Sequence, residues 1–225
     1  MHLTNEQIQQ TARIKRLNII NSITGVKPAN LIGSISENGH SNLAIFSSIV
    51  HLGSNPSLLG FILRPQHEVR RDTYENIMQT KYYTINHIPF DYVENAHYTS
   101  AKFDKEDSEF ERCKFTEEYL FDFYAPFVKE SRAKIGLKLE EMLPIELNKC
   151  VMVIGSIQHL WVDDVAVEED GQINLELLDD VGIGGLNSYY QLKRIAQFPY
   201  ARVNELPDFE SVSYTHLTLP TICSV

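Results

Sequence analysis

Short segments in which apolar and polar residues alternate make up much of the chain, separated by clusters of Gly, Pro, Asn and Ser. Because successive side chains of a strand point to opposite faces of a sheet, this alternation predicts β-strands. The predicted strands cover residues 29–35, 42–50, 58–63, 82–88, 150–162 and 172–178. The pattern therefore favours a mainly β protein.

Three segments have a helical pattern instead. We predict a first helix over residues 5–17 with Thr4 as its N-cap, a short helix over residues 72–80, and a late helix over residues 188–196. The stretch 104–127 is acidic, aromatic and irregular, so we expect it to lie outside the main sheet. The helices thus accompany a sheet and do not form the core themselves.

Residues 41–63 contain no charge, and their number approaches that of a membrane-spanning helix. Their centre reads HLGSNPS, a turn-forming cluster that a lipid-facing helix would not contain. Two strands joined by a loop explain the segment better. The polar start of the chain also lacks the apolar region of a signal peptide. We therefore expect a cytoplasmic protein without a membrane segment.

Charge and cysteine content narrow the classes of partner. The formal net charge of -10 argues against a nucleic-acid partner, because binding a phosphate backbone needs a surplus of Lys and Arg. Cys113, Cys150 and Cys223 are widely spaced and include no CxxC pair, which is a poor pattern for a disulfide framework or a metal site. A single small anion in a local basic pocket remains compatible with this composition.

The segment NLAIFSSIV carries small and hydroxyl residues beside its apolar face. Leu43, Ile45 and Ile49 share the face expected to point to the core. The other face carries Asn42, Ala44, Phe46 and Ser48, while Ser47 falls on the same face as the three apolar residues. This arrangement suits close approach by a ligand with many hydrogen-bond acceptors, and it also suits an ordinary edge strand.

The segment RRDTYENI places Arg71 directly before a predicted helix start at Asp72 and Thr73. A helix N-terminus offers free N–H groups and a partial positive charge, and a guanidinium and a hydroxyl beside it complete a small phosphate site. In the alternative interpretation, Asp72 or Thr73 caps the helix and Arg71 lies on the surface.

No motif indicates acid–base, nucleophilic or metal chemistry supplied by the protein. The run GIGG at residues 182–185 lacks the spacing of a dinucleotide fingerprint and predicts a loop. We interpret His87 as a hydrogen-bonded strand residue and the acidic residues 106–111 as a solvated face. If the chain is an enzyme, its chemistry belongs to a cofactor, and catalytic residues in the strict sense stay unassigned.

Several segments, in their order along the chain, resemble the flavin reductase-like family. They are GHSNLAIFSSIVHLGSNPSLLGFILRP, RRDTYENI, YYTINHI, HYTSAKFDKEDSEFER, YAPFVKES, NKCVMVIGSIQHLWV and GLNSYYQLKRIAQFPYAR, and the likeness covers roughly residues 15–205. The resemblance implies a mainly β fold with helices (α+β), namely an FMN-binding split β-barrel with flanking helices.

The resemblance also implies where the cofactor binds. Residues 42–48 match positions along the isoalloxazine and ribityl chain, residues 71 and 73 match phosphate-holding positions, and residues 100 and 102 match a segment near the cofactor. The expected FMN-binding residues are Asn42, Ala44, Phe46, Ser47, Ser48, Arg71, Thr73, Ser100 and Lys102, with no metal. Asp72 stands where a less acidic residue is common, and a capping carboxylate there would compete with the phosphate for the same N–H groups.

The implied function is that of an FMN-dependent oxidoreductase. Hydride would pass from a reduced nicotinamide, NADH or NADPH, to the flavin and onward to a small-molecule acceptor. Such proteins are usually homodimers with FMN at the subunit interface. One alternative is an FMN-binding carrier or electron-transfer protein without nicotinamide-dependent activity, and another is a split barrel that has lost its flavin.

The last fifteen residues, SVSYTHLTLPTICSV, differ in composition from the rest and contain no charge. We interpret residues 1–210 as one flavin reductase-like domain and residues 211–225 as a non-native tail arising from sequence read-through. The alternative is a genuine terminal strand.

Overall fold

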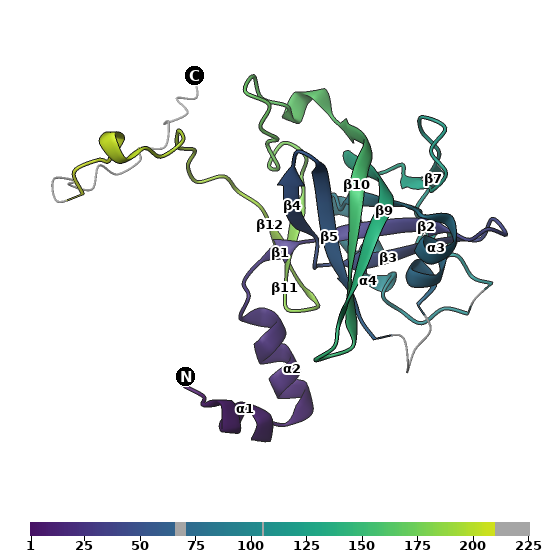
Figure 1. Ribbon diagram of the computed structural model, residues 1–225, viewed down its shortest axis with the longest axis horizontal. Helices are drawn as coiled ribbons and strands as arrows, with labels where there is room; N and C mark the ends of the chain where they lie inside the picture. Colours follow the sequence, from purple (N-terminus) through teal and green to yellow (C-terminus); the bar gives the residue numbers. More distant parts are fainter. Residues whose placement is uncertain (66–70, 105, 210–225) are drawn as a thin grey trace, which may run out of the picture. The chain divides into compact units, whose positions relative to one another are not determined.

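The computed structural model describes residues 1–65, 71–104 and 106–209. The chain forms two compact units, Met1–Lys193 and Arg194–Val225. Within the described part of the second unit, a 3-10 turn, η3 (Val203–Glu205), is the regular element. All strands and α-helices described belong to the first unit (Figure 1). The proposed tail 211–225 lies outside the described residues.

The centre of the first unit is a seven-stranded antiparallel sheet with the strand order β3-β2-β6-β9-β10-β5-β4 (Figure 1). Its strands are β2 (Asn30–Ile35), β3 (Ser41–Phe46), β4 (Val50–Ser54), β5 (Ser57–Leu63), β6 (Tyr82–His87), β9 (Ala133–Ile145) and β10 (Cys150–Val162). Strands β3 and β4 are the two edges and do not pair with each other, so the barrel is split. The predicted fold class is confirmed.

Two small sheets and several short helices flank the large sheet. The small sheets are β1 (Lys27–Pro28) with β11 (Val181–Gly184) and β12 (Ser188–Gln191), and β7 (Glu117–Glu118) with β8 (Phe127–Val128). The helices are α1 (Asn5–Gln10), α2 (Arg13–Ser22), α3 (Asp72–Thr80), α4 (Val93–Tyr98) and α5 (Glu109–Arg112), with 3-10 turns η1 (Phe90–Tyr92) and η2 (Asp164–Ala166). Among the described residues, no helix is long and apolar enough to cross a membrane.

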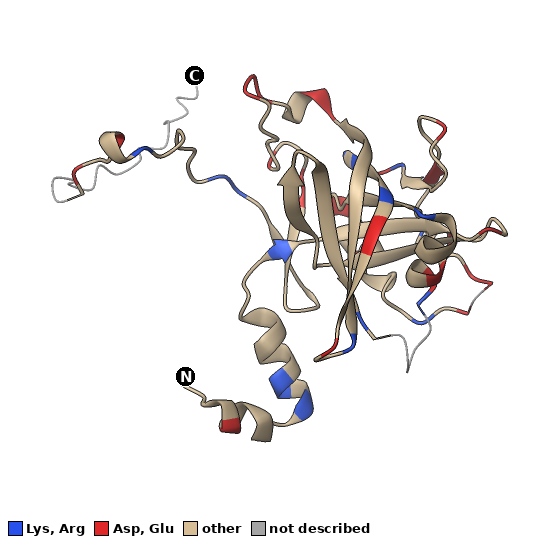
Figure 2. Ribbon diagram, in the orientation of Figure 1, with Lys and Arg blue, Asp and Glu red and all other residues tan. Residues whose placement is uncertain are grey.

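Apolar residues of the large sheet and of α3 form one buried cluster. It includes Ile32, Phe61, Ile77, Tyr83 and Val153, all of them inaccessible to solvent. A second buried cluster lies between β3, α4, α5 and β11. Charged residues lie mainly on loops and helix surfaces (Figure 2). Burial of these apolar side chains is the main force that stabilises the fold.

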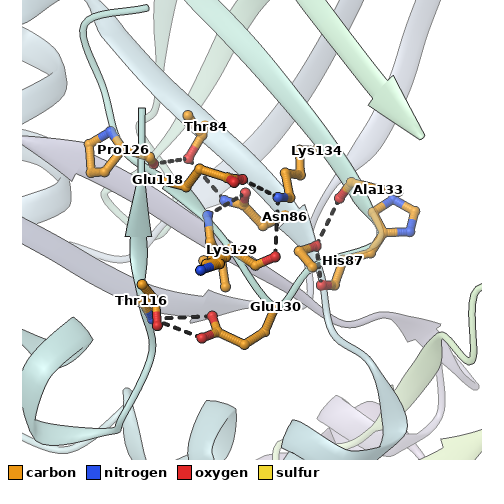
Figure 3. Close-up of polar contacts among 12 residues, drawn as sticks. Thr84, Asn86, His87, Thr116, Glu118, Pro126, Lys129, Glu130, Ala133 and Lys134 are labelled. Carbon is orange, nitrogen blue, oxygen red and sulfur yellow. Dashed lines mark hydrogen bonds and ion pairs between the residues drawn. The ribbon is translucent and has the colours of Figure 1, made fainter. Parts of the chain in front are cut away.

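A buried polar network joins β8 to the large sheet (Figure 3). The Thr84 hydroxyl donates to the carbonyl of Pro126 at 2.7 Å, and the Asn86 amide donates to that hydroxyl at 2.9 Å. The Asn86 side-chain oxygen accepts from the N–H of Val128 at 3.0 Å. Because buried polar groups are costly without partners, these bonds fix the position of the segment that precedes β9.

Many predicted elements agree with the structure. Helix α3 and strand β10 have the predicted bounds, and β2, β5 and β6 differ from theirs by one residue at an end. Thr4 caps α1 in a reciprocal capping box with Gln7. The charge-free stretch 41–63 forms strands, with β4 and β5 paired as a hairpin. His87 is a hydrogen-bonded strand residue, as predicted, with its Nδ1 at 2.5 Å from Asp180.

Four of the predictions outside the candidate site are wrong. The helix over residues 5–17 is two helices, because Thr11 and Ala12 adopt extended backbone angles. Of residues 172–178, Ile173 forms one isolated antiparallel bridge with Val167 and residues 175–178 form turns with bonds such as Leu177 N–H to the Asn174 carbonyl, so the predicted strand does not form. Residues 188–191 pair with β11 as a strand in place of a helix, and the run 182–185 is largely that strand in place of a loop.

Candidate functional site

A cleft of about 850 Å³ opens beside the edge strand β3. Its walls come from β3, the N-terminus of α3, the segment after α4, α5 and the α2–β1 region. All nine residues predicted to bind the cofactor line it, namely Asn42, Ala44, Phe46, Ser47, Ser48, Arg71, Thr73, Ser100 and Lys102. The fold therefore brings together residues that are up to sixty positions apart in the sequence.

One end of the cleft is built by the first turn of α3. Arg71 is the N-cap of this helix and makes no capping bond with its side chain. Its Nε is buried and has no hydrogen-bond partner among the described residues. Thr73 is buried beside it, and its hydroxyl accepts a hydrogen bond of 3.0 Å from the Asn42 side-chain amide. This turn thus joins a guanidinium and a hydroxyl at a helix N-terminus.

Strand β3 forms the wall next to this end. Asn42 is buried and Ala44 is half-buried, while the Phe46 ring packs edge-on against Phe61 with centroids 5.1 Å apart. The strand ends at Phe46, so Ser47 and Ser48 lie in the link to β4. The prediction of one strand over residues 42–50 is therefore wrong. The Ser48 hydroxyl accepts from the N–H of Ile62 at 3.0 Å, which fixes the link against β5.

Ser100 and Lys102 lie on the segment that follows α4. Both are exposed residues at the rim of the cleft. The Ser100 hydroxyl donates to the carbonyl of His97 at 2.7 Å and so continues the last turn of the helix. Since long side chains at a rim keep their mobility, these residues are less preorganised than Asn42 and Thr73.

Sequence reasoning missed Glu109 as a cleft residue. The segment 106–111 was predicted to be a solvated face, but Glu109 is half-buried, lines the cleft and accepts a 3.1 Å hydrogen bond from the N–H of Leu43. The reason is that Phe110 is buried in the core, where it packs α5 against β3. An apolar residue directly after Glu109 was the available signal. Lys27, Arg64 and Cys150 also line the cleft and were not predicted to do so.

The groups at the α3 end fit a phosphate monoester. A guanidinium donates in a planar fork that matches phosphate oxygens, and a helix N-terminus favours negative charge. A buried guanidinium N–H without a partner is costly, so the Arg71 Nε indicates a place for an acceptor. The adjoining β3 wall combines small, aromatic and hydroxyl side chains, which is typical of pockets for flat ligands.

Solved structures with the same fold come from several bacteria. A split-barrel protein of the flavin reductase type from Shewanella frigidimarina is 49% identical, with a TM-score of 0.85, over 89% of this chain and 100% of its own. Component B of nitrilotriacetate monooxygenase from Bacillus cereus is 20% identical, with a TM-score of 0.78, over 88% of this chain and 98% of its own. An FMN-binding protein from Thermus thermophilus is 15% identical, with a TM-score of 0.62, over 77% and 90%. The last two show likeness of fold alone.

The sequence pattern of the flavin reductase like domain matches residues 26–179, about two thirds of the chain. This range includes the large sheet, α3 to α5, and every predicted cofactor-binding residue. The split sheet is the architecture of the similar structures. The chain therefore belongs to the flavin reductase-like family of split-barrel proteins.

Proposed function

We propose that the protein is an FMN-dependent oxidoreductase that takes hydride from NADH or NADPH and passes electrons to a small-molecule acceptor. The observation that carries this proposal is the buried Nε of Arg71 at the N-terminus of α3, which has no partner among the described residues and lies at a cleft of about 850 Å³. Membership of the flavin reductase-like family supports a flavin as the ligand.

In this proposal, the residues of the cleft have distinct roles. Arg71 and Thr73 bind the phosphate, while Asn42 orients the Thr73 hydroxyl through their hydrogen bond of 3.0 Å. Ala44, Phe46, Ser47 and Ser48 line the ring and ribityl chain, and Ser100 and Lys102 close the rim. The hydrogen bonds that fix Asn42 and Ser48 hold these two parts of the wall before the cofactor enters.

FMN is proposed in preference to FAD because the cleft offers one compact phosphate site, at Arg71 and Thr73. The Thermus thermophilus neighbour, named as an FMN-binding protein, supports the same choice. The chemistry that a bound FMN supplies is acceptance of a hydride and release of its electrons to an acceptor. The protein residues need only bind, orient and exclude water, so no general base is assigned.

Two measurements on the purified protein test the proposal. Extracted flavin, or flavin taken up by the apo-protein, is identified by chromatography, and FMN is expected. The FMN-loaded protein is then mixed anaerobically with NADH or NADPH, and bleaching of the flavin absorbance is expected. Bound FMN that neither nucleotide bleaches would favour the alternative function, a flavin carrier or electron-transfer protein. A protein that takes up no flavin would contradict both.

A further inference from the structure

Glu109 is a carboxyl group inside the cleft that the proposed function does not use. It is the first residue of α5, and its Oε2 accepts a hydrogen bond from the N–H of Leu43 at 3.1 Å. Leu43 lies in β3, an edge strand of the large sheet. The Glu109 side chain therefore occupies the position in which a further strand would pair with β3, the strand that forms a wall of the cleft.

Two hydrogen bonds place Glu109 close to the proposed phosphate site. Leu43, whose N–H bonds Glu109, directly follows Asn42, whose side chain bonds the Thr73 hydroxyl at 3.0 Å. Thr73 and Glu109 are thus hydrogen-bonded to consecutive residues of β3, and both line the same cleft. A phosphate bound at Thr73 would lie in the same cleft as this carboxylate, beside Asp72, whose charge already acts on Glu109.

The surroundings of Glu109 already disfavour its charge. Burial raises the pKa of the Glu109 carboxyl, the negative charges of Asp72 on α3 and Asp107 raise it further, and hydrogen bonds from backbone N–H groups partly oppose both effects. Strand β3 contains no titratable residue. Burial raises the pKa of the nearby Cys113 thiol and the negative charge of Glu109 raises it further, so the thiol adds no charge beside Glu109. The cations that line the same cleft are Lys27, Arg64, Arg71 and Lys102.

We propose that Glu109 couples binding of the flavin phosphate to proton uptake. A dianionic phosphate beside this carboxylate makes its ionised form less favourable, so the group takes up a proton when the phosphate enters. The inference rests on the proposed function, since the ligand is a flavin carrying a phosphate. Glu109 then acts as a sensor of ligand charge, which helps the cleft to accept a dianion despite the nearby Asp72.

The direction of the pH dependence follows from the thermodynamic linkage between proton binding at Glu109 and FMN binding. The pKa of Glu109 is higher in the occupied cleft than in the empty one, so a fall in pH favours the occupied form. Between these two pKa values, FMN affinity rises by up to about tenfold for each unit by which the pH falls, and outside this window the contribution of Glu109 is flat. The phosphate of FMN itself titrates near pH 6 and acts in the opposite direction, because it loses charge on protonation.

The test compares proton uptake in three proteins. Apo-protein is titrated with FMN by calorimetry in two buffers of different ionisation enthalpy, over a series of pH values, which gives the number of protons taken up. Wild type is expected to take up more protons than the isosteric variant Glu109→Gln. Asp72→Asn is the matched control, and it is expected to retain uptake through Glu109. With riboflavin, which lacks the phosphate, wild type and Glu109→Gln are expected to agree.

Three results would overturn the inference. Equal FMN-linked uptake in wild type and Glu109→Gln would show that Glu109 does not titrate, while the proposed function would stand. Uptake that is lost in Asp72→Asn and kept in Glu109→Gln would assign the proton to Asp72. Absence of FMN binding at every pH in all three proteins would contradict the proposed function and with it the inference.

Discussion

Two cationic side chains, one buried and one with a buried Nε atom, differ in how their donors are satisfied. Lys134 is 3% exposed, pairs with the Glu118 carboxylate, donates to a backbone carbonyl and lies 4.7 Å from the centre of the Trp161 ring. Figure 3 shows its bonds to the Glu118 carboxylate and to the carbonyl of Lys129. Arg71 has a buried Nε without a partner among the described residues. Buried donors without an acceptor are rare, so the environment of Arg71 indicates a bound ligand, whereas that of Lys134 does not.

The substitution Arg71→Ala is expected to weaken FMN binding by roughly ten- to a hundredfold, since a hydrogen bond to a charged group contributes on the order of 1.5–3 kcal/mol. Titration of apo-protein with FMN measures the loss. Riboflavin should bind both proteins almost equally, and Arg71→Lys should recover part of the affinity because a point charge cannot reproduce the planar fork. An equal loss for both ligands would show that Arg71 acts through the fold.

The nine proposed binding residues could be chosen from the sequence because they come from two local patterns and a family resemblance. Asn42 and Thr73 are separated by thirty-one positions, and each was recognised within its own segment. The position of Glu109 could not be predicted, because it depends on a contact with Leu43 across sixty-six positions. Local periodicity contains no information on such long-range pairing.

At the level of elements, prediction succeeded where local pattern and tertiary environment agree. Strand β10 reads as an alternating run between polar loops and has its predicted bounds, whereas its partner β9 was missed. The β9 sequence AKIGLKLEEMLPI contains Lys, Glu and Pro, which are depleted in strands. It forms a strand because it pairs with both β6 and β10. Residues 172–178 alternate but pair through a single bridge, Ile173 with Val167, so the alternating pattern predicted a strand that does not form.

Strand β2 has a glycine that the packing of its neighbours requires. A Cβ at Gly33 would lie 2.4 Å from the Pro126 carbonyl oxygen and 2.6 Å from the Thr84 hydroxyl, two atoms that are hydrogen-bonded to each other. Gly33→Ala is therefore expected to lower the free energy of unfolding by about 1–3 kcal/mol, as overpacking does. Denaturant unfolding measures the change. The same substitution at Gly53, where the nearest atom is 3.2 Å away, should cost less.

On the scale of the whole molecule, helix α2 buries none of its residues. Ile14 and Ile20 of this helix are 67% and 46% exposed, its C-cap Ile23 is 78% exposed, and Ile20 also lines the cleft. Isolated helices of this length are marginal in water without tertiary packing. A second copy of the chain that covers this helix would supply that packing, which is consistent with the homodimer that we propose from the family resemblance.

Light scattering is expected to give the mass of a dimer for the FMN-loaded protein. Ile23→Glu should shift the equilibrium toward monomer, because it places a charge in the apolar surface that the partner would cover. Ile195→Glu, at an exposed isoleucine of the second unit, is the matched control and should leave the mass unchanged. A wild-type monomer with bound flavin would contradict the proposed dimer.

The cleft is assembled from segments that lie between Ile20 and Leu186. During synthesis, the chain emerges from its N-terminus, so the wall contributed by Ile183 and Leu186 is the last to be made. No earlier stretch of nascent chain contains a complete site. Contacts of such long sequence separation also form slowly, because loop closure precedes any gain from packing. In the proposed function, loading of FMN is therefore a late event in the maturation of this protein, after the split sheet has folded around its core.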